Sequence, residues 1–276
     1  MHDDDRPMGR RLSRRELVGL FGASVAAVAA TSRARDAGGA AIAGAALPQG
    51  ASLAAQDCIA LPQQTEGPYF VEERLERSDI RVDPSTGVAS RGIPLDLRLV
   101  ISSVTDAGAC QALARAQVEV WHCDAAGVYS DVRDRSLDTT GQKFLRGHQT
   151  TDAAGLARFA TIYPGWYGGR AVHIHFKVRT PGAGGRTDEF TSQLYFDDAL
   201  TDRVHGLAPY SEHKGQRLLN SRDMIFREGG PKLVLPVVES GDGYAATFRI
   251  GMRSGEPAAP GPPPRGRRGF GPGGPA

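Results

Sequence analysis

Residues 161–178 read Thr-Ile-Tyr-Pro-Gly-Trp-Tyr-Gly-Gly-Arg-Ala-Val-His-Ile-His-Phe-Lys-Val and place a tyrosine, an arginine and a His-x-His pair where a loop meets a strand. Side chains alternate across a strand, so His173, His175 and Lys177 should share one face. The apolar residues among them should point into a core (Val172, Ile174, Phe176 and Val178). With a rise of about 3.3 Å per residue, the two imidazoles lie roughly 6 to 7 Å apart and can tilt onto one ion. Taken alone, such a pair is more typical of a solvated polar face, so a metal site depends on the rest of the chain.

A second informative segment lies upstream. Residues 118–130 combine a strand pattern, an Asp/Ala/Gly turn and Tyr129. With the motifs around it, this segment resembles the intradiol ring-cleavage dioxygenases. The resemblance covers roughly residues 58 to 250 in the order of that family, and its other motifs are Thr65-Glu66-Gly67-Pro68-Tyr69-Phe70, Phe144-Leu145-Arg146-Gly147 with Thr151-Asp152-Ala153-Ala154-Gly155, the 161–178 stretch, and Thr191-Ser192-Gln193-Leu194-Tyr195-Phe196.

This resemblance implies a non-haem ferric ion, Fe(III), held by Tyr129, Tyr167, His173 and His175. The chemistry fits those residue types. A free phenol has a pKa of about 10, yet a trivalent cation is a strong enough Lewis acid to bind it as phenolate. Neutral imidazoles complete the set and leave an open position, as a catalytic metal site requires.

The reaction that the resemblance implies is cleavage of a catechol-type diol between its hydroxylated carbons, with dioxygen, to a cis,cis-muconate-type diacid. Tyr167, on a glycine-rich loop, would leave the metal when the diol binds. Arg170 would stabilise negative charge that develops on the ring, because its guanidinium is always cationic. Gln193 would assist from a neighbouring strand.

The mouth of the pocket is assigned by the same resemblance. Thr65 and Tyr69 match positions where an N-terminal arm lies against the substrate, and Arg170 would also contact it. The alternative is that this motif is purely structural, a Gly-Pro turn that carries a packed aromatic residue. Catechol, hydroxyquinol and a protocatechuate-like diol all remain candidates for the substrate.

Two alternatives from other classes stay open. A β-sandwich can be a secreted binding module for a saccharide or aromatic polymer, with Trp166, Tyr167 and Tyr129 as a stacking platform. The same ligand residues could instead hold copper or zinc, because imidazole suits all three metals.

The chain also departs from the family pattern in two places. Only two glycines separate Tyr167 from Arg170, where many relatives have a longer insertion. No room remains ahead of Thr65 for the N-terminal helical dimerisation region of the catechol-cleaving branch. The nearest resemblance is therefore to exported, single-domain members, as a monomer or a homodimer.

The N-terminus predicts export. Ser13-Arg14-Arg15-Glu16-Leu17 resembles a twin-arginine signal, and the apolar run 17–30 is too short and too rich in alanine to span a membrane. That route carries folded proteins, which suits an enzyme that collects its iron first. We expect membrane contact only during export, to the periplasm or the extracellular space. A cytoplasmic protein with a basic N-terminus is the alternative.

Charge and composition divide the chain. Residues 1–35 and 252–276 each carry +3, and the net charge is +2, so residues 36–251 carry −4. A mildly acidic body offers no basic face to nucleic acid. We predict a signal and linker over 1–46, an N-terminal arm over 47–90, a β-sandwich catalytic domain over 91–252 and a Pro/Gly/Arg tail over 253–276 that is disordered.

Strand patterns dominate that body. Short apolar or alternating segments recur between turn signals at 95–102, 117–122, 156–162, 172–179, 190–196, 232–238 and 244–250. This spacing predicts an all-β fold, an antiparallel β-sandwich with long active-site loops, in agreement with the resemblance. Residues 197–228 should form a long excursion with helical turns. The sequence assigns no chemical role to three polar residues within it, Tyr210, Asn220 and Asp223.

The remaining cysteines and histidines suggest structural roles. One disulfide and one buried thiol are expected after export, with Cys58 to Cys110 the first pairing to test and Cys123 in the core. His122 and His148 have no partner ligand nearby in sequence, so we expect them to be structural.

Overall fold

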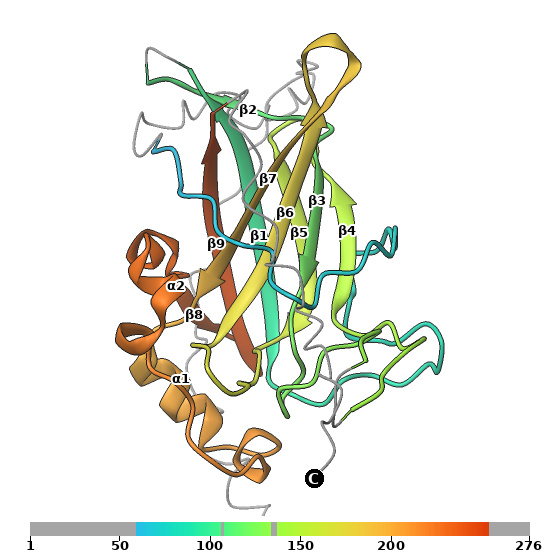
Figure 1. Cartoon of the computed structure of the whole chain (residues 1–276), viewed down its shortest axis with the longest axis vertical. Helices are drawn as coiled ribbons and strands as arrows, with labels where there is room; N and C mark the ends of the chain where they lie inside the picture. The colour runs from blue at the N-terminus through green and yellow to red at the C-terminus, as the bar shows by residue number, and fades with distance from the viewer. Residues whose placement is uncertain (1–58, 106–107, 134–136, 254–276) are drawn as a thin grey trace, which may run out of the picture. The chain divides into compact units, whose positions relative to one another are not determined.

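The computed structural model describes residues 59–105, 108–133 and 137–253, which form two β-sheets (Figure 1). The first sheet has the order β2-β1-β9-β8, with β5 also paired to β1. Its strands are β1 (Pro94–Val104), β2 (Cys110–Ala112), β5 (Leu156–Ile162), β8 (Val237–Ser240) and β9 (Gly243–Met252). The second sheet has the order β4-β3-β6-β7 and comprises β3 (Gln117–Trp121), β4 (Arg146–Thr150), β6 (His173–Pro181) and β7 (Thr187–Tyr195).

The predicted β-sandwich is confirmed, with one addition. All pairs in the two sheets are antiparallel except β1 with β9, which run parallel from Leu95 opposite Tyr244 to Ser103 opposite Met252. The long separation in sequence between β1 and β9 leaves room for the crossover that a parallel pair requires.

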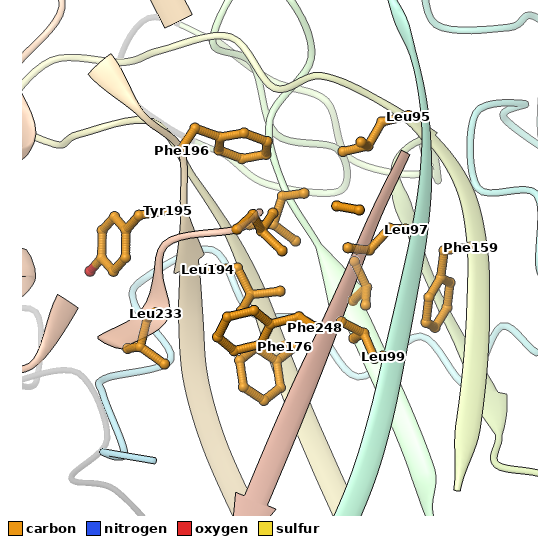
Figure 2. Close-up of a cluster of buried hydrophobic side chains, with 14 of the residues drawn as sticks. Leu95, Leu97, Leu99, Phe159, Phe176, Leu194, Tyr195, Phe196, Leu233 and Phe248 are labelled. Carbon is orange, nitrogen blue, oxygen red and sulfur yellow. The ribbon is translucent and has the colours of Figure 1, made fainter. Parts of the chain in front are cut away.

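The core lies between the sheets (Figure 2). In β1 every second residue is buried, so Leu95, Leu97, Leu99 and Ile101 face inward while the residues between them are partly exposed. The opposite wall comes mainly from β6, where the alternation predicted for residues 172–178 places the apolar set in the core. Burying each such side chain contributes about 1.5 to 3 kcal/mol, so this alternation holds the polar face of β6 outward.

Six of the seven expected strands are present, and the seventh prediction is largely wrong. Residues 232–238 were expected to be a strand, but a short 3-10 turn, η5 (Gly230–Leu233), occupies the start and β8 begins only at Val237. Pro231 and Pro236 have no backbone N–H, which prevents a continuous ladder there. The short strands β2 and β4 were not predicted, because Cys-Gln-Ala and Arg-Gly-His-Gln-Thr lack an apolar pattern.

The excursion between β7 and β8 contains helical turns, as expected. They are α1 (Asp198–His205), η3 (Tyr210–Glu212), η4 (Asn220–Arg222) and α2 (Met224–Arg227), and a further 3-10 turn, η2 (Ala183–Gly185), joins β6 to β7. Asp197 begins α1 by accepting a hydrogen bond from the Leu200 N–H, and Asp223 begins α2 in the same way. In the described ranges, no helix has the length and apolar character needed to cross a bilayer.

The arm segment, residues 59–76, crosses the outer face of the second sheet (cyan in Figure 1). The Gln64 N–H donates to the Thr191 carbonyl on β7 at 2.9 Å, Lys177 on β6 pairs with Glu66 at 2.8 Å, and Arg179 pairs with Glu72 at 2.8 Å. The face that carries His173 and His175 is therefore covered by this segment. The predicted signal and linker over 1–46, Cys58 and the tail beyond residue 253 lie outside the described residues, and the domain boundaries stay predictions.

Candidate metal centre

One cross-strand row of the second sheet organises the site. Arg146 on β4 pairs with Trp121 on β3, Trp121 with His175 on β6, and His175 with Gln193 on β7. Residues paired in this way present their side chains to the same face of a sheet. The apolar neighbours of these residues, such as Val120 and Ile174, belong to the core. The row therefore carries its polar and aromatic side chains to the outer face, under the arm segment.

The two imidazoles converge as the His-x-His spacing predicted. The Nε2 atoms of His173 and His175 are 2.9 Å apart. His173 Nδ1 lies 2.6 Å from the Ala171 carbonyl oxygen, which can only accept, so that nitrogen carries the proton and Nε2 keeps its lone pair. Burial lowers the pKa of His173 to about 3 and that of His175 well below its ordinary value. Both rings are therefore neutral, the form that binds a metal.

The two predicted tyrosine ligands lie beside these rings. The Tyr167 hydroxyl is 3.4 Å from His173 Nε2, and the rings of Tyr129 and Tyr167 meet edge to face with centroids 5.5 Å apart. Tyr129 is 3% exposed, and its hydroxyl makes no hydrogen bond of normal geometry. Burial raises the pKa of both phenols above the ordinary value. Without a cation to bind, both hydroxyls stay protonated.

This arrangement fits a metal ion. The buried Tyr129 hydroxyl lacks a partner, and the Nε2 atoms of two neutral imidazoles face one another at 2.9 Å. Buried polar atoms are normally hydrogen-bonded, so a buried hydroxyl without a partner beside these nitrogens marks a place for a missing ligand. Within 59–105, 108–133 and 137–253, no three His, Cys, Asp or Glu side chains form a metal-binding group by themselves. Any ion here would need the two phenol oxygens as well as the imidazoles.

Arg170 reaches the same site from the loop before β6. Its Nη2 donates to Gln193 Oε1 at 2.5 Å and to the Tyr195 hydroxyl at 3.4 Å, while its Nε donates to Asp223 Oδ2 at 2.9 Å. Gln193 in turn donates to the Thr65 carbonyl oxygen at 2.8 Å. The structure thus brings the predicted Arg170 and Gln193 into direct contact and links both to the arm segment.

Asp223 is the residue that sequence reasoning missed. It is 1% exposed, and its Oδ2 accepts from both Arg170 Nε and the Ala171 N–H, the latter at 2.8 Å. Its Oδ1 accepts from the Ile225 N–H at 2.8 Å and so begins α2. The sequence signal was only that of a helix cap, because Asp223 stands 53 residues after Arg170.

The arm residues contribute unequally. The Tyr69 ring stacks on Tyr129 with centroids 4.7 Å apart and an interplanar angle of 24°, and it meets Tyr167 edge to face at 5.7 Å. Thr65 lies at the site through its backbone, while its hydroxyl accepts from the Gly67 N–H at 3.2 Å within its own turn. Tyr69 therefore forms a wall of the site, and the Thr65 side chain stabilises the turn that delivers it.

His122 and the cysteines have structural positions. His122 is fully buried, contacts the Cys123 carbonyl at 2.8 Å and the Thr161 hydroxyl at 2.6 Å, and burial lowers its pKa to about 4. Its partners are core groups, as the prediction of a structural role requires. Cys123 is a buried free thiol, also as expected, and Cys110 is disulfide-bonded. His148 on β4 lies opposite Glu119 on β3 in the strand register, two residues along from the row that contains Trp121 and His175.

Comparisons with known proteins agree with this geometry. A family profile described as "Dioxygenase" matches residues 65–225, more than half of the chain. A catechol 1,2-dioxygenase of Acinetobacter lwoffii is 26% identical over 219 residues, which is 68% of this chain and 66% of that protein. The chain spans two thirds or less of the length of the curated relatives it matches.

Two solved structures are also similar. An intradiol ring-cleavage dioxygenase from Tetranychus urticae superposes with a TM-score of 0.61 at 28% identity, covering 71% of this chain and 95% of that one. The dioxygenase domain of a fusion with a carbohydrate-binding protein from Streptomyces sp. SirexAA-E gives a TM-score of 0.51 at 28% identity, covering 71% and 99%.

Proposed function

The chain belongs to the intradiol ring-cleavage dioxygenase family, and on that premise we propose that it binds Fe(III) and cleaves a catechol-type diol between its two hydroxylated carbons. Tyr129, Tyr167, His173 and His175 would hold the ion. The observation that supports this most directly is the convergence of two neutral imidazoles, 2.9 Å apart at Nε2, with the buried Tyr129 phenol and the partly buried Tyr167 phenol. Phenolates are hard anionic donors, so this set suits a trivalent ion better than copper or zinc.

When bound, ferric iron would supply the Lewis acidity that holds both oxygens of a deprotonated diol and opens its ring carbon to dioxygen. The chain's own residues would orient the ligand side chains and stabilise the charge that develops on the substrate. The hydrogen bond from His173 Nδ1 to Ala171 fixes its ring so that Nε2 faces the ion. Trp121 lies flat against His175 and holds that ring in turn.

Tyr167 has the freedom to act as a proton acceptor. Its loop continues into Gly168 and Gly169, both exposed, whereas Tyr129 is enclosed by Trp121, Cys123 and the arm segment. A phenolate that leaves the ion can take one of the two protons that a diol must lose on binding. Tyr129 would stay in place.

Arg170 is held where negative charge develops. Its guanidinium is fixed on one side by Asp223 and on the other by Gln193, and its side chain is 14% exposed. Because it is already oriented, it can stabilise charge on the ring without reorganising during the reaction. Tyr69 supplies an aromatic wall for a ring-shaped substrate. The product would be a cis,cis-muconate-type diacid, and catechol, hydroxyquinol and protocatechuate are the diols to test.

A binding module is less consistent with the site. A stacking platform must be open to its ligand, but Tyr129 is 3% exposed and Trp166 is stacked on His213 with centroids 4.1 Å apart and an interplanar angle of 5°. Two of the three aromatic residues that such a module would use are therefore already packed.

The test is the visible absorption spectrum of the purified protein loaded with Fe(III), before and after catechol is added without oxygen. We expect a red-brown tyrosinate-to-iron band that moves to longer wavelength when the diol binds, followed by diacid formation when oxygen is admitted. Tyr129→Phe should lose much of the band. A protein that stays colourless after loading would rule out the ferric site.

Export through a twin-arginine-type signal is part of the proposal. Replacing Arg14 and Arg15 with lysine should retain the protein in the cytoplasm, as measured by cell fractionation. Export that continues unchanged would refute this part alone and leave the ferric site untouched.

A further inference from the structure

Arg146 is a buried cation that forms no ion pair with any described carboxylate. It is 2% exposed, and among the described residues its guanidinium donates only to Ser130: Nε reaches the carbonyl oxygen at 3.1 Å and the hydroxyl at 2.9 Å, and Nη2 reaches the carbonyl oxygen at 2.6 Å. Nη1 is buried and has no partner. Burying a full charge is unfavourable unless an opposite charge lies close to it.

The carboxylates around Arg146 are engaged elsewhere. Glu73 and Asp131 both pair with Lys143, and Glu119 pairs with Arg179 at 2.8 Å. A second guanidinium, that of Arg77, donates to the Arg146 carbonyl oxygen through Nε at 2.8 Å. The carboxylates near Arg146 therefore act on it only through space, because each is paired with another cation.

Tyr129 is the group that could supply this anion. The guanidinium carbon of Arg146 lies 6.0 Å from the centroid of the Tyr129 ring, and Ser130, which Arg146 holds, is the next residue in the chain. The Tyr129 hydroxyl is itself buried without a hydrogen bond of normal geometry. A neutral phenol gives a cation only the weak attraction of its ring face, whereas a phenolate gives it a full opposite charge.

The backbone on either side of the contact between Arg146 and Ser130 is conformationally strained. Leu145, directly before Arg146, has φ +53°, and Asp131, directly after Ser130, has φ +51°. Left-handed conformations are unfavourable for residues with a Cβ by about 1 to 2 kcal/mol. Strain of this kind persists where the surroundings fix the geometry, and here both strained residues flank the Arg146–Ser130 contact.

We propose that Arg146 is the counter-charge of the Tyr129 phenolate in the ferric protein, a positioning residue that fixes this ligand and sets its electron-donating strength. The inference rests on the proposed function. A cation beside the phenolate stabilises the negative charge before an electron moves toward iron, and it disfavours that movement. Arg146 should therefore keep the tyrosinate-to-iron band at shorter wavelength.

The experiment compares Arg146→Met with Arg146→Lys in the full chain without substrate. Both variants remove the fork that holds Ser130, but only the lysine keeps the charge. Arg146→Met should move the band to longer wavelength, because the phenolate loses the positive charge that stabilises it. Arg146→Lys should recover most of the band position. Equal band shifts in both variants, or none in either, would overturn the inference.

A second pair of variants does not depend on removing Arg146. Ser130→Asp places a carboxylate beside its guanidinium and neutralises it, and Ser130→Asn is the neutral control of the same shape. We expect the band to move to longer wavelength in the aspartate variant alone, and a band that is the same in both variants would contradict the proposed charge effect. A wild-type protein without any tyrosinate band would instead refute the ferric site itself, so the two failures are distinguishable.

Discussion

The Trp121 indole lies parallel to the His175 imidazole, with centroids 5.0 Å apart and an interplanar angle of 5°. The two residues are directly paired across β3 and β6, so their stacking follows from strand register. His175 Nδ1 has no hydrogen-bond partner, which leaves the stacked indole as the main support of this ring.

Replacing Trp121 with leucine should weaken metal binding by loosening His175. Stacked aromatic pairs contribute about 0.5 to 1.5 kcal/mol beyond burial, which corresponds to roughly a two- to tenfold loss in Fe(III) affinity. Competitive titration with a chelator measures it. Phe70→Leu is the control, because it removes an edge contact to Trp121 and keeps the stack. An equal loss in both variants would show that the effect is general loosening of the cluster.

Asp223→Asn should reduce turnover while leaving the metal site intact. Asparagine can still begin α2, but it withdraws the charge that fixes Arg170 Nε. We expect kcat/KM to fall about ten- to a hundredfold, as small displacements of an orienting group do, with an unchanged iron content and resting spectrum. Asp198→Asn, which breaks the distant pair with Arg217, is the matched control. Normal turnover in Asp223→Asn would remove this residue from the positioning of Arg170.

Gly67→Ala and Gly87→Ala form a matched pair that isolates the approach of the arm segment to the His175 ring. The two glycines have φ +73° and +72°, so both substitutions should cost about 1 kcal/mol of folding stability. A Cβ at Gly67 would lie 3.2 Å from His175 Cε1, whereas one at Gly87 has nothing within 4 Å. Only Gly67→Ala should therefore change the visible spectrum or lower the iron content. Identical spectra would show that the arm tolerates displacement.

Acid should destabilise the apoprotein through His122. Burial lowers its folded pKa to about 4 from an ordinary 6.5, so the unfolded chain binds a proton first as the pH falls. The contribution of neutral, buried His122 to the free energy of unfolding is fully present above about pH 6.5. It is lost as the pH falls to about 4, and the loss amounts to roughly 3 kcal/mol. Urea unfolding at pH 7 and pH 4.5 measures this change.

His173 and His175 act in the same direction in the apoprotein, so the wild-type slope contains all three histidines. His122→Gln retains a group that can reach Thr161 and should show a shallower pH dependence than wild type. Parallel curves for the two proteins would mean that His122 is protonated in the fold or that its surroundings relax.

The local pattern of apolar and polar residues was enough to predict most of the strands and the central histidine pair of the site. Strict alternation in residues 172–178 was enough to predict that His173 and His175 share a face, because the apolar residues between them must enter the core. The strands with a clear pattern were found at nearly their observed bounds. The segment 232–238 was misassigned because two prolines outweigh its apolar composition.

Relationships between distant segments were not accessible in this way. The row of Arg146, Trp121, His175 and Gln193 depends on the register of four strands, which no single segment encodes. The contact between Arg170 and Asp223 depends on where a long excursion returns to the sheet. The family resemblance supplied the order of the ligand residues, and the structure added the buried charges that surround them.

The arm segment has a kinetic consequence for the metal. It is joined to β7 by the Gln64 N–H and to the excursion by the Gln64 side chain, which donates to the Ile225 carbonyl at 2.9 Å, and it places Tyr69 over Tyr129. If release of an ion from this site requires these contacts to open, its exchange with solution would follow the rate of a local unfolding event. Strong chelators at saturating concentration should then strip iron at one common rate, whatever their identity.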